Sequence, residues 1–308
     1  LSKSLFVIIF VFCINIFARD VIDDNGVCKI NWTQGNIICE GESAPNQSKY
    51  AANLSAKVIA QRNMLEVVKG VRITSELTIK NGLESSEVIK SRVDGVIRGA
   101  QVISKKYDTK IKSSVVTVKL RMGVDILSSL LSDPTLLSWN ENISRLWNNF
   151  SLITKANAST YSQQERETIL KILKDLSGNE NAKIHLQGIL DNINGDFTGI
   201  LIDIRELNNF KKALMVKLVN VNGKEFYPLG KVPKSTLTKR NTSVGYIFGL
   251  DDARKNKRVF SSPLEIKAHS TYKNKLSNIV ISDSQINKIN SLDESVLKSA
   301  KIILVLDD

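Results

Sequence analysis

The segment Lys301-Ile-Ile-Leu-Val-Leu306 says most about the fold of this chain. A strand with one face in water alternates apolar and polar side chains, because successive side chains point to opposite faces. Here the lysine is followed by apolar residues only, so both faces of the strand need cover. The segment predicts a strand in the centre of a covered sheet.

The residues before this strand predict a sheet-plus-helix unit. Ser282 or Asp283 can cap a helix that runs to about residue 300. Asn222-Gly223 indicates a hairpin, because a tight turn needs the positive φ that glycine adopts readily. Strands are expected at residues 184–190, 198–204, 213–220, 225–227, 244–248, 264–268 and 279–281. We assign residues 183–308 to a C-terminal α+β domain.

The first half of the chain has a similar mixture of elements. Two short strands flank a turn at Gln34-Gly35-Asn36, and Asn46 or Ser48 can cap the helix that follows. An apolar stripe on that helix is expected to contain Ala51, Leu54, Val58, Leu65 and Val68.

Downstream of this helix, alternation of apolar and polar residues predicts a strand at 71–80. A short helix at 86–93 and a hairpin formed by 100–107 and 111–122 complete the pattern. We expect residues 19–127 to form a sheet with a long helix across one face.

Residues 128–182 are rich in Ser, Asn and Leu and separate the two units. Two apolar faces at helical spacing, one around Trp139 to Phe150 and one around Ile169 to Leu176, predict two amphipathic helices. The expected fold class is therefore α+β, with two small sheet-plus-helix domains joined by an amphipathic helical linker.

The N-terminus has the layout of a secretory signal peptide. Lys3 precedes an apolar run at residues 5–14, and Ala18 offers a small residue at a cleavage point before Arg19. The run is shorter than the roughly 20 residues that span a bilayer. We therefore expect residues 1–18 to be removed and the protein to reach the periplasm or the periplasmic face of the outer membrane.

Cys28 and Cys39 are the two cysteines that remain after such a cleavage. An oxidising compartment favours a disulfide between them. The register decides whether the bond forms. A two-residue turn at Gln34-Gly35 would place Ile30 opposite Cys39, whereas a four-residue turn from Trp32 to Gly35 would align the two cysteines.

The motifs of common catalytic sites are missing from this sequence. It has no phosphate-binding glycine loop and no nucleophile elbow, and its two histidines are His185 and His269. Both histidines lie in expected strands, where structural or surface positions are more common than ligand roles. We expect a protein that is not an enzyme and holds no cofactor or metal.

Positive charge is the main candidate for a binding signal, since the formal net charge is +12. Asp203 and Arg205 lie two apart on one strand and so share a face, where they form either a ligand site or an ordinary salt bridge. A basic cluster can serve an anionic partner such as peptidoglycan or lipopolysaccharide, or can be a solvated surface. Its members are Lys231, Lys234, Lys239, Arg240, Arg254, Lys255, Lys257 and Arg258. A second basic excess lies at Lys105, Lys106, Lys110, Lys112, Lys119 and Arg121.

Three stretches of residues 29–122 carry a resemblance to a known family. They are Ile30-Asn31-Trp32-Thr33, the helix end Arg62 to Val71, and Arg92 to Ala100 before the valine-rich strand. Together they resemble the LPP-twenty lipoprotein family of the bacterial envelope and flagellar basal body. This sequence departs from the family pattern in lacking a convincing lipidation motif and in carrying Cys28 and Cys39.

The second half is similar to the C-terminal region of long members of the same family. The similar stretches are Phe197 to Asp203, Asn222 to Glu225, Val244-Gly245-Tyr246 and Pro263 to Ala268. The resemblance implies a non-catalytic scaffold or binding protein at the outer membrane or flagellar base, with envelope or flagellar proteins, or a second copy, as partners. The alternatives are a monomeric periplasmic binder of anionic cell-wall polymer and, less favoured, a hydrolase. Nucleic acid is not an expected partner of an exported protein.

Overall fold

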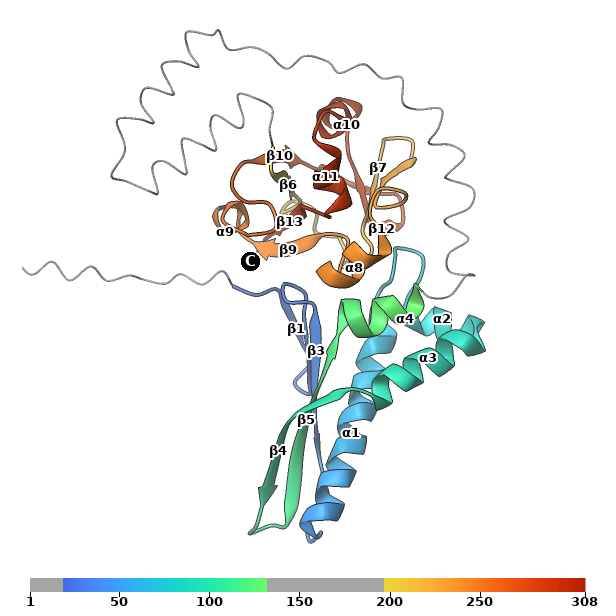
Figure 1. Ribbon diagram of the computed structural model, residues 1–308, viewed down its shortest axis with the longest axis vertical. Coiled ribbons are helices and arrows are strands. Elements are labelled where there is room, and N and C mark those ends of the chain that lie inside the picture. The colour runs from blue at the N-terminus through green and yellow to red at the C-terminus, as the bar shows by residue number, and fades with distance from the viewer. Residues whose placement is uncertain (1–18, 132–196, 308) are drawn as a thin grey trace, which may run out of the picture.

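The computed structural model describes residues 19–131 and 197–307, which form two α+β domains packed end to end (Figure 1). The expected fold class of two sheet-plus-helix domains is confirmed. The predicted signal peptide, the predicted linker helices and the predicted strand at 184–190 lie outside the described residues.

The N-terminal domain is built on one antiparallel sheet of five strands in the order β1-β2-β3-β5-β4. Cys28 lies opposite Cys39 and Asn31 opposite Asn36, so the turn between β2 and β3 contains four residues. Of the two registers considered, the aligned one is present, and a disulfide joins the cysteines with their Cα atoms 4.1 Å apart. The strands are β1 (Ile22–Asp24), β2 (Cys28–Asn31), β3 (Asn36–Glu42), β4 (Gln101–Asp108) and β5 (Ser113–Arg121).

Helix α1 (Lys49–Gly70) lies across one face of this sheet, and the Ser48 side chain caps it by accepting from the Ala51 N–H. The predicted apolar stripe is wrong at Ala51, Leu54 and Val58, which are exposed, whereas Leu65 packs against the core and Val68 is buried. The buried residues are Ala52, Ala56, Ala60, Met64 and Val68. The cause is close packing: a Cβ added at Gly41 of β3 would lie 2.2 Å from the Ala60 nitrogen. Only small side chains fit between such backbones, so the larger Leu54 and Val58 point to solvent.

The strand predicted at residues 71–80 is not formed. Its residues make one isolated bridge between Arg72 and Thr78, and then enter α2 (Ile79–Ser85), which is followed by α3 (Glu87–Arg98). The alternating apolar residues Val71 and Ile73 are nevertheless buried. After β5 the chain forms a short π-helix, η1 (Met122–Leu127), and α4 (Ser128–Leu130).

The C-terminal domain contains two four-stranded sheets. In the first, ordered β10-β6-β13-β9, all three pairings are parallel. Strand β13 is central, and the residues from Ile302 to Val305 are buried, which confirms the expectation for this apolar segment. The second sheet is ordered β11-β12-β7-β8. The strands are β6 (Gly199–Asp203), β7 (Lys217–Val219), β8 (Glu225–Tyr227), β9 (Gly245–Phe248), β10 (Pro263–Lys267), β11 (Thr271–Tyr272), β12 (Lys275–Val280) and β13 (Ile302–Leu306).

Short helices complete the C-terminal domain. They are α8 (Lys234–Arg240), α9 (Leu250–Arg254), α10 (Asp283–Asn290) and α11 (Glu294–Lys298). The helix predicted from residue 283 to about 300 is therefore two helices. Ser282 caps α10 with a capping box, and the Asp293 side chain accepts from the Ser295 N–H to start α11. A second capping residue thus divides the helical segment.

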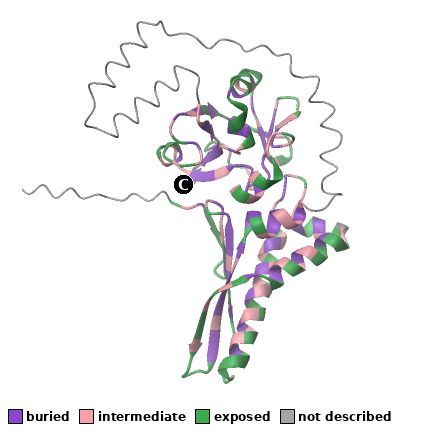
Figure 2. Ribbon diagram, viewed as in Figure 1, coloured by how far each residue is buried: buried purple, intermediate pink, exposed green. Residues whose placement is uncertain are grey.

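The two domains share one hydrophobic core that runs across their junction (Figure 2). The Trp32 and Tyr246 rings meet edge to face with centroids 5.5 Å apart. Thr33 Oγ1 donates to the Tyr246 carbonyl at 3.0 Å. Trp32 Nε1 donates to the Asp23 carboxylate at 2.7 Å, and Lys212 Nζ lies 2.7 Å from the same carboxylate. The turn between β2 and β3 therefore contacts the second domain through packing and a hydrogen bond, and Asp23 of β1 adds an ion pair.

Two glycines allow the C-terminal domain to approach the N-terminal backbone closely at this junction. A Cβ added at Gly35 would lie 2.3 Å from the Asn241 Cβ, and one at Gly123 would lie 2.1 Å from the Thr238 carbonyl oxygen. Asn241 of the C-terminal domain bonds two segments of the N-terminal domain: its Nδ2 donates to the Gln34 carbonyl at 3.3 Å, and its Oδ1 accepts from the Gly123 N–H at 3.1 Å. The domains are thus packed directly on each other.

Backbone hydrogen bonds also cross the junction. The Leu214 N–H donates to the Arg72 carbonyl, and the Met215 N–H donates to the Ile73 carbonyl, each at 2.9 Å. The segment after α1 therefore pairs with a segment of the C-terminal domain. Its alternating pattern reflects this cross-domain pairing.

Candidate functional site

The carboxyl edge of the parallel sheet is where a ligand site is expected on general grounds. In open sheets of this kind, ligands bind outside the carboxyl ends of the strands, where neighbouring connections diverge. Strand β6 ends at Asp203 and its neighbour β10 ends at Lys267. The loops that follow these two strands therefore start side by side.

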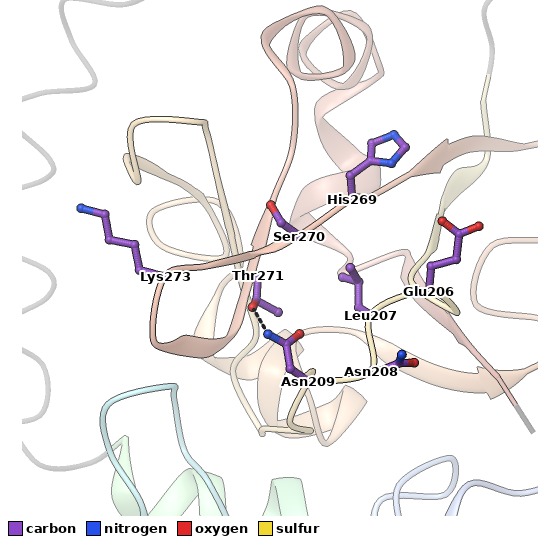
Figure 3. A pocket seen from close by; sticks show the side chains of 8 residues that line it. All are labelled: Glu206, Leu207, Asn208, Asn209, His269, Ser270, Thr271 and Lys273. Atoms are coloured by element: carbon purple, nitrogen blue, oxygen red, sulfur yellow. Dashed lines mark hydrogen bonds between the residues drawn. The ribbon is translucent and has the colours of Figure 1, made fainter.

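These loops enclose a shallow hollow of about 390 Å³ that is open to solvent (Figure 3). One wall is the loop after β6, and the other is the segment between β10 and β12. The Asn209 Nδ2 donates to Thr271 Oγ1 at 3.2 Å and ties the two walls together. The hollow is lined by Glu206, Leu207, Asn208, Asn209, His269, Ser270, Thr271 and Lys273.

Two ion pairs lie beside the hollow. Arg205 binds the Asp203 carboxylate through two donors, Nε at 2.9 Å and Nη2 at 2.7 Å. The hydrogen bond from Arg205 lowers the pKa of Asp203, and the same contact raises the pKa of Arg205. Lys267 Nζ lies 2.5 Å from Glu206 Oε1. The charges on this edge are therefore paired with each other in the structure.

The chemistry that this lining supports is recognition of a small polar ligand. Two amide side chains, two hydroxyls, one imidazole and one ammonium supply both donors and acceptors. Leu207 is the single aliphatic residue of the lining, so the hollow offers little apolar contact. Among residues 19–131 and 197–307, no three His, Cys, Asp or Glu side chains come together as metal ligands would.

The predicted pair Asp203 and Arg205 lies at the rim of this hollow, because the chain continues from Arg205 into the lining residue Glu206. Neither member of the pair lines the hollow itself, and a ligand role for the pair stays a prediction. His269, for which a partly buried or surface position was expected, is exposed within the lining. His185 lies outside the described residues. The amides Asn208 and Asn209 were missed, because only the parallel strand order brings their loop to the loop after β10.

The structure divides the predicted basic cluster into engaged and exposed side chains. Arg258 donates to the carbonyls of Ala300 at 2.7 Å and Thr242 at 2.9 Å, and burial lowers its pKa to about 10. Arg254 binds Glu265 through Nε at 2.6 Å and Nη2 at 2.8 Å.

Further members of the cluster also have structural partners. Arg240 donates to the Ser299 carbonyl, and Lys234 donates to the Leu131 carbonyl at the junction. Lys231 is half-buried, whereas Lys239, Lys255 and Lys257 are exposed. These three lysines are the part of the predicted cluster that is best placed to meet an anionic partner.

The comparisons with known proteins concern the C-terminal domain. Residues 199–308 match a family model described as Treponema pallidum Tp0624, second domain. The match begins at the first residue of β6 and covers the whole of the second domain as the structure describes it, so this domain is similar to that one. No curated protein sequence matches the chain. No helix among the described residues is both long enough and apolar enough to cross a bilayer.

Proposed function

We propose that this chain is an exported, non-catalytic scaffold or binding protein of the cell envelope, which holds two α+β domains in a fixed relation and presents their surfaces to partner proteins. The observation that carries the proposal is the shared core at the junction. A scaffold keeps its partners at fixed relative positions only if its own domains do not move relative to each other. Gly35 packs against the Asn241 side chain and Gly123 against the Thr238 backbone, and these close contacts resist such movement, because packed interiors transmit displacement.

Export is supported by the disulfide. Cys28 and Cys39 are both buried and bonded, and such bonds persist in oxidising compartments, whereas reducing ones keep thiols free. The charged start, apolar run and small residue of the first 18 positions support the same compartment. The family resemblance extends the proposal to the periplasmic face of the outer membrane or to the flagellar base.

Cell fractionation followed by N-terminal sequencing tests the proposed compartment. We expect the chain in the periplasmic or outer-membrane fraction, beginning at Arg19 and without free thiols. A chain found in the cytoplasm with Leu1 retained and both Cys28 and Cys39 reduced would contradict export.

Crosslinking in the native cell tests the scaffold role. We expect crosslinks from both domains to envelope or flagellar proteins, or to a second copy of the chain. A Gly123→Val variant should lose crosslinks that depend on both domains, because its side chain would collide with the Thr238 carbonyl. Crosslinks that remain unchanged in a folded Gly123→Val variant would show that the fixed relation of the domains is not needed.

A second candidate function, binding of an anionic cell-wall polymer, is favoured by the exposed Lys239, Lys255 and Lys257. Association of this kind weakens as salt shortens the Debye length from about 10 Å at 0.1 M. Retention on peptidoglycan sacculi or lipopolysaccharide should therefore fall with salt and with replacement of these three lysines by Gln. Arg258 is not a suitable site for this test, because it supports the Ala300 and Thr242 carbonyls. Equal retention by the triple variant would assign the lysines to a solvated surface.

A further inference from the structure

The N-terminal domain has one end that faces away from the C-terminal domain. We call it the distal tip and define it as residues 43–54, which enter α1, together with residues 104–114, which contain the turn between β4 and β5. In Figure 1 the start of α1 and the ends of β4 and β5 lie together at the extremity farthest from the second domain. Figure 2 shows that the ribbon at this end is largely exposed.

Backbone hydrogen bonds hold the two parts of the distal tip together. The Asn46 N–H donates to the Ile111 carbonyl, and the Gln47 N–H donates to the Lys112 carbonyl, each at 3.0 Å. Tyr107 Oη donates to the Gln47 carbonyl at 3.0 Å. The tip is therefore an ordered surface, and a partner that binds it does not have to order it first.

The charge of the distal tip is strongly one-sided. Within residues 43–54 and 104–114, Asp108 is the single acidic residue, and the exposed Glu42 directly precedes the first of these ranges. The Asp108 carboxylate accepts from the Lys110 N–H at 2.7 Å and so serves the turn. The lysines of the tip are all exposed, and they are Lys49, Lys105, Lys106, Lys110 and Lys112.

Large apolar side chains accompany these lysines. Tyr50 is 80% exposed and Ile111 is 51% exposed. On α1 the exposed apolar side chains continue at Leu54 and Val58, which lie at successive turns on the face opposite the buried alanines. Exposed apolar side chains of this size, grouped and surrounded by one sign of charge, mark an interaction surface.

We propose that the distal tip docks on a membrane surface that contains anionic phospholipids. Lysines beside a headgroup layer gain from its negative potential, and a tyrosine is favoured at the boundary between headgroups and acyl chains. A protein partner would need roughly 800 Å² of complementary surface on each side, whereas a narrow projecting end meets a membrane without a matching groove. The charge and the shape of the tip therefore fit a lipid surface better than a protein groove.

This docking surface is separate from the exposed lysines of the C-terminal domain and from the scaffold role, so it stands or fails independently of the proposed function. It would orient the molecule with the N-terminal domain towards the membrane and the C-terminal domain away from it (Figure 1).

Vesicle co-sedimentation tests the proposal with a chain that begins at Arg19. This start keeps the described N-terminal domain and removes the apolar run at residues 5–14, which would bind vesicles by itself. The probes are vesicles of phosphatidylcholine alone and vesicles that also contain phosphatidylglycerol. The tip variant is Lys49→Gln, Lys110→Gln and Lys112→Asn, where Asn suits the positive φ of 53° at residue 112. The matched control replaces Lys239, Lys255 and Lys257 by Gln.

We expect the unaltered chain and the control to bind the anionic vesicles and to lose binding at high salt. Each tip lysine should contribute about five-fold to partitioning, equivalent to ~1 kcal/mol, so the tip variant should bind about 100-fold more weakly. Tyr50→Ser should weaken binding further at constant charge. Equal binding by the tip variant and the control, or no binding by the unaltered chain, would overturn the proposal. A dimer in solution that Tyr50→Ser separates, without vesicle binding, would overturn it in favour of contact between two copies.

Discussion

The two ends of the N-terminal domain carry different hairpin turns with different surroundings: the turn between β2 and β3 packs on the C-terminal domain, and the turn between β4 and β5 is exposed. At the junction end, Trp32 is 4% exposed and Gly35 and Gly123 allow backbone contact with the C-terminal domain. At the distal tip, Tyr50 is 80% exposed and the surrounding lysines point to water. An aromatic side chain and a tight turn occur at both ends, but among the residues that the structure describes only the junction end is covered.

The difference teaches that the side chains of a turn decide whether another domain can pack closely on it. The junction turn contributes glycine and short polar side chains, which permit close approach, while the tip turn contributes lysines, which disfavour it. We therefore expect substitutions at the junction to change the free energy of unfolding and substitutions at the tip to change association.

The largest expected effect distinguishes the two aromatic residues. Trp32→Ala should reduce the free energy of unfolding by about 3 to 5 kcal/mol, because it empties a buried site and removes the donor to Asp23. Tyr50→Ala, the matched change at the tip, should alter it by no more than about 0.5 kcal/mol. Urea unfolding followed by circular dichroism measures both. Similar losses of unfolding free energy in the two variants would contradict the distinction between the covered junction and the exposed tip.

Removal of the disulfide should affect the domain between its two ends. Replacing Cys28 and Cys39 by Ser should cost about 2 to 3 kcal/mol, because the bond restricts a short loop in the unfolded chain. Urea midpoints of the paired variant and of the unaltered chain, with and without reductant, give the difference. An equal urea midpoint of the unaltered chain with and without reductant would show that the disulfide contributes little to the free energy of unfolding. Two free thiols in the unfolded, unreduced protein would show that it is absent.

Gly123→Ala tests the close approach at the junction directly. The new Cβ would lie 2.1 Å from the Thr238 carbonyl oxygen, and relief of such overlap typically costs about 1 to 3 kcal/mol. The control is Gly95→Ala in α3, where nothing lies within 4 Å of an added Cβ and an alanine should stabilise the helix by up to about 1 kcal/mol. Opposite signs are expected from thermal unfolding. An equal loss of stability in Gly95→Ala and Gly123→Ala would show that close packing at the junction is not the cause of the loss.

The smallest effect is expected at the carboxyl edge of the C-terminal domain, away from both ends of the first. Asp203 has a pKa below the ordinary 3.8 because Arg205 donates to it. Its stabilising contribution is therefore present above about pH 4 and is lost as the pH falls through the lowered pKa. Arg205→Gln should return the pKa of Asp203 towards 3.8 and change stability by less than about 1 kcal/mol, because the pair is partly exposed. NMR titration of the Asp203 carboxyl group measures this pKa. An unchanged pKa in the Arg205→Gln variant would show that Arg205 does not lower the pKa of Asp203.

Local patterns in the sequence were sufficient for several elements. The uninterrupted apolar segment at 302–306 could be assigned to a central strand because both faces of β13 are covered. For the cap of α1 and the cysteine register the sequence left two alternatives each, and the structure has the Ser48 cap and the aligned register.

Long-range contacts explain what the sequence could not predict. The buried face of α1 is set by Gly41, which draws alanines against β3 and leaves Leu54 outside. The segment after α1 alternates like a strand because Arg72 and Ile73 accept from Leu214 and Met215, which lie far along the chain. The hollow depends on the parallel order of β10 and β6. None of these partners can be identified from a local window.

Native-state hydrogen exchange at Leu214 and Met215 tests most directly whether the two domains fold as one unit. The Leu214 and Met215 amides donate across the junction to the Arg72 and Ile73 carbonyls, each at 2.9 Å. The Ile200 amide donates to the Lys301 carbonyl at 2.9 Å and provides a reference inside the C-terminal domain. One folded unit predicts the same opening free energy at all three amides, and an equal decrease at all three in Gly123→Ala. Exchange of Leu214 and Met215 through a local opening, several kcal/mol below that of Ile200, would contradict it.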